Sequence, residues 1–153
     1  MTRADAELGP HGLADAALVD APAVRQDRLR QRVPLRLHAL ISEAVLRQQV
    51  GGPEVMRAQL CHLAEVAALP NVHVQVVPFH AGAHSGLSGS FNVFSFAEPG
   101  AVDVGYTETI ASTVWVESAE GSALFRATFD RVARLSLAPR DSVELIEGIS
   151  KGW

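Results

Sequence analysis

The sequence contains one cysteine and no long apolar run. Cys61 has no second cysteine in the chain with which to form a disulfide. No hydrophobic stretch approaches the roughly 20 residues that a membrane-spanning helix needs. The N-terminal segment carries Asp5 and Glu7 where a secretory signal would need an apolar core. These absences predict a cytoplasmic protein.

An excess of basic residues is also missing. The chain has 13 Lys and Arg against 17 Asp and Glu, which gives a net charge of −4. Proteins that bind nucleic acid gain most of their affinity from basic side chains on phosphates. Five arginines do cluster over 25–36, but Asp27 lies among them, and Leu29 and Val33 supply an apolar side at helical spacing. We therefore predict a solvated helix there, with no direct nucleic-acid partner and no membrane partner.

The length and composition indicate one domain. With 153 residues, of which 48 % are hydrophobic, the chain can bury a core without disulfides or a metal ion. Residues 1–22 are rich in Ala, Gly, Asp and Pro, and predict a loosely held arm with at most a short helix over Leu13–Val19. We place the folded domain at 23–153.

Hydrophobic periodicity predicts the order of the elements. Apolar residues recur with period two over 35–42, 72–79, 90–96 and 102–108, and 113–116 adds a short edge strand. Helical spacing covers 54–69 and 120–137. The pattern Asp141-Ser142-Val143-Glu144 is typical of a capping box and predicts a last helix that ends near Gly148. The fold class expected is α+β, a mostly antiparallel sheet of four or five strands covered on one face by the two longer helices.

Two carboxylates are placed at the ends of apolar strand faces. Glu108 follows Val104 and Tyr106 on one face of its strand, and Glu43 ends the row that begins at Leu35. A carboxyl group in such a position has a raised pKa and can transfer protons near neutral pH. The alternative is that both side chains reach solvent where the sheet ends. Tyr106, the one tyrosine, is either a core ring or a hydrogen-bond donor in a pocket.

The histidines give only a weak metal signal. His80 and His84 have the gap found between zinc-binding histidines, but they lie in a loop rich in glycine and alanine, without a second cysteine. The glycines of 81–89 precede a strand, whereas a phosphate-binding loop precedes a helix. We predict no metal and no cofactor, and treat His84 as a loop residue that makes an ordinary hydrogen bond or contacts a ligand.

Several segments resemble one known family. They run from Val50 to His84, through Ser90-Phe91 and 104–109, to Leu137-Ala138-Pro139 and on to Ile146, about three-quarters of the chain. The chain is similar here to the C-terminal domain of actinobacterial XRE-type regulators, antitoxin-like proteins that read DNA with a separate N-terminal helix-turn-helix. That helix-turn-helix is absent from this sequence.

The resemblance implies a domain that senses a partner or ligand through a concave apolar surface. The aromatic residues that we expect to line it are Phe91, Phe94, Phe96, Tyr106 and Trp115. The function expected is the binding of an aromatic or polyketide-like small molecule, acting as a cofactor-free dehydratase or cyclase in specialised metabolism. Its acid and base candidates, in order of preference, are Glu108, Tyr106, His84, Asp103 and Glu43. The alternative is a non-enzymatic antitoxin-like regulator that acts through a protein partner. Besides the small-molecule ligand, the partners considered are a second copy in a homodimer or an antitoxin-type protein.

Overall fold

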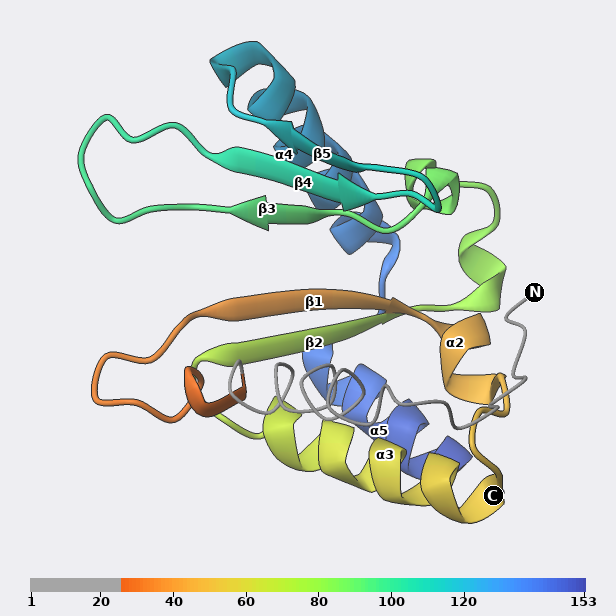
Figure 1. Ribbon diagram of the computed structural model, residues 1–153. Helices are drawn as coiled ribbons and strands as arrows, with labels where there is room; N and C mark the ends of the chain where they lie inside the picture. The colour runs from red at the N-terminus through yellow and green to blue at the C-terminus, as the bar shows by residue number, and fades with distance from the viewer. Residues whose placement is uncertain (1–25) are drawn as a thin grey trace, which may run out of the picture.

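The computed structural model describes residues 26–153 (Figure 1). The predicted arm at 1–22 and the short helix at 13–19 lie outside the described residues. Within 26–153, no helix combines the length and the apolar character needed to span a membrane.

The first half of the described chain is a strand–helix–strand unit. β1 (Leu37–Ser42) leads into the short helix α2 (Glu43–Arg47) and then α3 (Pro53–Ala67). The next strand, β2 (Val72–Val77), pairs with β1 in parallel, with Leu37 opposite Val72 and Ser42 opposite Val77. Pro53 suits the first position of α3, where a missing N–H costs nothing, and Gly52 at φ 95° makes the turn that precedes it.

The last two helices of the chain pack against the sheets. α4 (Ala119–Leu135) begins at Ser118, whose side chain accepts a hydrogen bond from the Gly121 backbone N–H. α5 (Pro139–Ser150) packs beside α3 against one face of the β1–β2 sheet (Figure 1). Near the C-terminal end of α4, the ring of Phe129 lies 4.9 Å from that of His38 on β1.

The segment that enters α5 covers the free edge of β2 where a third strand would lie. The Val76 N–H donates to the Ser142 hydroxyl at 2.9 Å, and the Val76 carbonyl accepts from the Leu137 N–H at 2.9 Å. The Gln75 side chain donates to the Leu137 carbonyl at 2.8 Å. These bonds satisfy backbone groups that an open sheet edge would leave unpaired.

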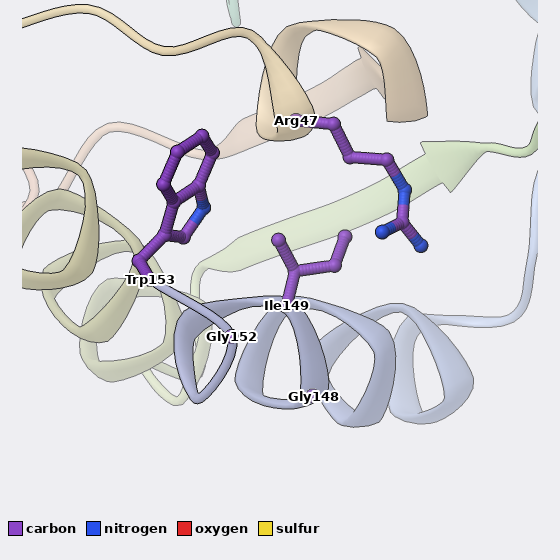
Figure 2. A pocket seen from close by; sticks show the side chains of 5 residues that line it. All are labelled: Arg47, Gly148, Ile149, Gly152 and Trp153. Atoms are coloured by element: carbon purple, nitrogen blue, oxygen red, sulfur yellow. The ribbon is translucent and has the colours of Figure 1, made fainter. Parts of the chain in front are cut away.

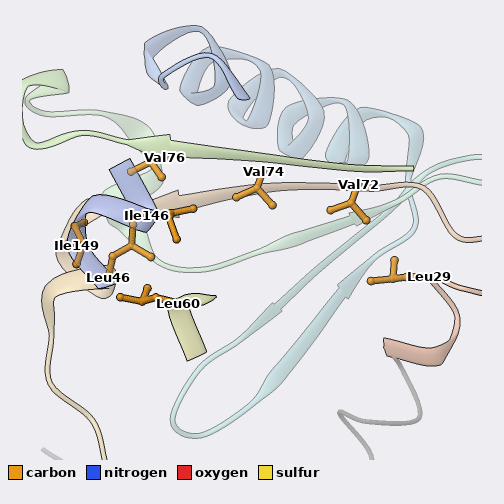
Figure 3. Packing of buried hydrophobic residues seen from close by; sticks show 8 residues of the cluster. All are labelled: Leu29, Leu46, Leu60, Val72, Val74, Val76, Ile146 and Ile149. Atoms are coloured by element: carbon orange, nitrogen blue, oxygen red, sulfur yellow. The ribbon is translucent and has the colours of Figure 1, made fainter. Parts of the chain in front are cut away.

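The hydrophobic core lies between the β1–β2 sheet and the helices α3 and α5 (Figure 3). Its fully or nearly buried members come from β2, from the helices α2, α3 and α5, and from the segment that precedes β1. They are Leu29, Leu46, Leu60, Val72, Val74, Val76, Ile146 and Ile149.

A second sheet is antiparallel and follows two short 3₁₀ turns at Phe79–Ala81 and Ser85–Ser88. It contains β3 (Asn92–Phe94), β4 (Val104–Glu108) and β5 (Thr113–Val116), in that spatial order. α4 packs against one face of this sheet.

The α+β class is confirmed, but the prediction of one mostly antiparallel sheet is wrong. The strands form a two-stranded parallel sheet and a three-stranded antiparallel one. A helix of four turns separates β1 from β2, and such a crossover returns the chain in the same direction. The two long helices also do not share one face of a sheet: α3 packs against the β1–β2 sheet, whereas α4 packs against the three-stranded sheet and also contacts β2.

Two local predictions are corrected as well. The arginine cluster is mostly turns and bends over 28–33 rather than a helix, and Val33 is 81 % exposed while Leu29 is buried. The last helix begins at Pro139, not at Asp141, and runs to Ser150. Asp141 therefore lies in the first turn rather than at the cap, which is Ala138 and has no side-chain cap hydrogen bond. The Ser142 hydroxyl, one residue further on, accepts from the Val76 N–H of β2.

Candidate functional site

Three aromatic rings gather on one face of the antiparallel sheet. Tyr106 lies directly opposite Trp115, and Phe94 lies opposite Val104. Because side chains alternate along a strand, Phe94, Tyr106 and Trp115 all point to the same side. The Tyr106 and Trp115 ring centroids are 4.5 Å apart, and the Phe94 ring stacks on Trp115 at 6.2 Å. We call these three residues the aromatic face.

The aromatic face is open. Trp115 is 57 % exposed and Phe94 is 44 % exposed. The other side of the sheet is closed by α4, because a Cβ added to Gly105 would lie 2.8 Å from the Phe125 ring. Glycine at 105 thus lets the helix approach the back of β4 closely. No helix within residues 26–153 packs on the aromatic side.

Two of the predicted ligand-contacting phenylalanines make no ring contact with Phe94, Tyr106 or Trp115. The Phe91 ring meets the Phe125 ring of α4, with centroids 5.5 Å apart, on the covered side of the sheet. Phe96 follows the end of β3 and is exposed. The structure therefore brings together three of the five aromatic residues expected to form a surface.

Of the predicted acids and bases, Tyr106 belongs to the aromatic face, and Glu108 is the one carboxylate that shares it. It is the last residue of β4, two positions after Tyr106, and lies opposite Thr113. Its side chain is exposed, and its carboxylate makes no ion pair with any residue of 26–153. Glu108 therefore remains available to a partner or ligand.

Asp103 is held by α4. Its carboxylate accepts from the Arg126 Nε at 2.7 Å, and Arg126 also donates to the Ser95 hydroxyl at 2.6 Å. The hydrogen bond from Arg126, and next the one from Ser95, lowers the pKa of Asp103 below its ordinary value of 3.8. This residue ties the β3–β4 connection to the helix. Sequence could not reveal the pair, because 23 positions separate its members.

Glu43 also makes structural contacts within the fold. It is the first residue of α2, and its carboxylate accepts from the Phe79 backbone N–H at 3.0 Å and from the Arg47 Nε at 2.9 Å. The Phe79 hydrogen bond lowers the pKa of Glu43 most, burial opposes it, and Arg47 reinforces it. The expectation of a raised pKa for Glu43 is wrong, because two donors meet its charged form.

This arrangement makes stability depend on pH through Glu43. The pKa of Glu43 is lower in the folded chain than its ordinary value of 4.5. The stability that its charge contributes is therefore complete at pH values above 4.5 and is lost as the pH falls through the lower pKa of the folded state. Glu43→Gln keeps an acceptor for Phe79 but removes the charge. Urea unfolding should show the variant less stable than wild type at pH 7, and the gap should close on acidification.

The matched control is Glu144→Gln, which breaks an exposed i,i+4 pair with Arg140. Exposed pairs of this kind contribute little. A Glu43 gap that persisted unchanged into acid would contradict the role assigned to its charge.

His84 lies beside α4 rather than on the aromatic face. A Cβ built on Gly86 would touch both the His84 Nδ1 and the Val132 side chain of α4, at 3.0 and 3.4 Å. The Nδ1 atom is buried and has no hydrogen-bond partner among the described residues. No group of three or more His, Cys, Asp or Glu side chains within 26–153 is placed to hold a metal ion.

A shallow pocket of about 260 Å³ opens at the end of α5 (Figure 2). Its lining residues are Arg47, Gly148, Ile149, Gly152 and Trp153. It contains none of the predicted site residues, and its volume falls short of the roughly 300–1,000 Å³ typical of small-molecule sites. The aromatic face is therefore the stronger candidate.

Comparison with known proteins identifies a family but no individual relative. No curated protein and no solved structure matches the chain. One family model, described as a domain of unknown function (DUF5753), matches residues 6–148. The match spans nearly the whole sequence, and the chain belongs to the DUF5753 family.

Proposed function

We propose that this domain is a docking module that binds a protein partner through the aromatic face. The observation that carries the proposal is the cluster of Phe94, Tyr106 and Trp115 on the side of the sheet that α4 leaves uncovered. Monomeric proteins seldom expose grouped apolar side chains unless they bind something, and Trp, Tyr and Phe are enriched where proteins meet.

The openness of the surface favours a protein over a small molecule. Sites for small molecules bury most of the ligand's surface. Here the Phe94 and Trp115 side chains are about half exposed, Tyr106 is partly buried, and Asn92 and Thr113 beside them are exposed. A broad partner surface can cover such a face, whereas a small compound would remain largely in water.

Partner binding also agrees with the resemblance to the C-terminal domains of actinobacterial XRE-type regulators. In that setting the domain would act without catalysis, as an antitoxin-like regulatory protein. Direct contact with DNA is not part of the proposal, since the sequence carries a net charge of −4.

A random peptide phage library tests the docking function. Selection on the wild-type domain should enrich peptides that bind it at least about tenfold better than Phe94→Ser/Trp115→Ser, because interface aromatics commonly contribute more than 1 kcal/mol each. Binding is measured by titration of the enriched synthetic peptides.

Phe79→Ser is the matched control, since Phe79 is 62 % exposed at another site. Peptides selected on wild type should bind this variant normally. Enriched peptides that bind the double variant as well as wild type would show that the aromatic face is not the docking surface.

A second candidate function is acid–base catalysis on an aromatic compound, as a cofactor-free dehydratase or cyclase. The specific observation that favours it is Glu108, which lies two residues from Tyr106 on the same strand face and has no ion-pair partner within 26–153. Glu43 and Asp103 are committed to structural contacts. Turnover of a candidate polyketide that survived both Glu108→Gln and Tyr106→Phe would exclude this mechanism.

A further inference from the structure

The antiparallel sheet carries charge of one sign. Residues 58–125 contain no lysine or arginine, and four carboxylates fall within 90–117. Asp103 pairs with Arg126, but Glu98, Glu108 and Glu117 are exposed and make no ion pair within the described chain. The aromatic face therefore lies in an acidic surround, which favours an occupant that is both apolar and basic.

One segment of this chain has that chemistry. The arginine loop, which we define as residues 28–36, carries Arg28, Arg30, Arg32 and Arg36, all exposed and none in an ion pair with a residue of 26–153. It also exposes Val33 at 81 % and Leu35 at 56 %. The loop thus presents apolar side chains between positive ones.

The arginine loop is held in a fixed shape. The Asn71 side-chain amide donates to the Leu29 carbonyl at 3.1 Å and to the Leu35 carbonyl at 2.7 Å. The Leu35 N–H closes the loop by donating to the Arg28 carbonyl at 3.0 Å. A loop ordered in advance loses less conformational entropy when it binds.

We propose that the aromatic face is occupied by the arginine loop of a second copy of this chain. The inference rests on the proposed docking function and names the partner. Arginine guanidinium groups stack on Trp and Tyr rings, Val33 and Leu35 cover apolar surface, and the flanking carboxylates meet the remaining positive charge. In a twofold dimer the same contact forms twice, because each copy contributes one loop and one face.

Charge reversal tests both surfaces. The loop variant is Arg30→Glu/Arg32→Glu, and the sheet variant is Glu108→Arg/Glu117→Arg; all four side chains are exposed, so folding should be retained. Sedimentation equilibrium should give wild type twice the 16.3 kDa chain mass. Each variant alone should dissociate about 100-fold more readily, since like charges would then face each other.

Mixing the two variants gives the decisive result. The reversed loop of one meets the reversed sheet of the other, and the unreversed loop meets the unreversed sheet, so both contacts of the dimer become attractive. An equimolar mixture should therefore recover the dimer as a heterodimer. Arg57→Glu/Arg131→Glu changes the net charge equally at exposed positions elsewhere, and should remain dimeric.

Three outcomes would overturn the proposal: a wild-type monomer at every concentration up to the solubility limit, a dimer indifferent to both reversals, or variants that do not recover on mixing. Failure of self-association is separable from failure of docking. If the domain failed to self-associate but the selected peptides still required Phe94 and Trp115 for binding, the docking function would stand and only the identity of the partner would change.

Discussion

Ile146→Ala should lower the free energy of unfolding by about 2–5 kcal/mol. Ile146 has no exposed surface and lies on α5 within the core cluster, near Leu60 of α3 and Val76 of β2 (Figure 3). Truncation removes buried methyl groups and leaves a cavity that the surrounding strands and helices cannot easily fill. Urea titration followed by far-ultraviolet circular dichroism measures the change.

Ile110→Ala is the matched control. Ile110 lies between β4 and β5 and is wholly exposed, so the same truncation should change stability by no more than about 0.5 kcal/mol. Equal losses for the two variants would mean that Ile146 is not the core residue described here.

Ser142→Ala should cost about 1–3 kcal/mol, although Ser142 is a small polar residue. Its hydroxyl accepts from the Val76 N–H and donates to the Ala138 carbonyl, both at 2.9 Å, and the side chain is fully buried. Alanine would leave the Val76 N–H buried without an acceptor. Native-state hydrogen exchange should show that amide losing protection as global stability falls.

Ser150→Ala provides the comparison within the same helix. Ser150 is also buried, but its hydroxyl only donates to the Glu147 carbonyl one turn earlier, so its loss orphans no backbone N–H. The cost should be clearly smaller than for Ser142. Similar costs at both positions would contradict the role given to Ser142 at the sheet edge.

Local elements were largely predictable from this sequence, because hydrophobic periodicity is a local property. The edge strand expected at 113–116 is β5, and the helix expected at 54–69 is α3 at Pro53–Ala67. The start of α5 was missed because Asp141 and Glu144 match a capping box, whereas Pro139 holds the first helical position. Proline at a helix start was the better signal.

Strand pairing was not predictable from the same pattern. Alternation shows which side chains share a face, but not which strand lies alongside. The parallel pairing of β1 with β2 depends on α3 crossing between them, and the 137–142 segment covers the other edge of β2. Those contacts join residues that lie far apart in the sequence.

The candidate site was predictable in part for the same reason. Alternation along β4 correctly placed Tyr106 and Glu108 on one face. It could not show that Phe91 turns toward Phe125, or that Glu43 receives the Phe79 N–H from another segment. Burial and charge at these positions are set by neighbours that no local window contains.

Helix α4 contacts strands of both sheets and so connects them mechanically. Its Phe125 fills the space left by Gly105 behind the aromatic face, while Phe129, one turn later, rests on His38 of β1. One rigid helix therefore spans from the back of β4 to the surface of β1. We therefore expect that a partner which restrains the three-stranded sheet also restrains the strand–helix–strand unit, because Phe125 and Phe129 lie one turn apart on the same helix.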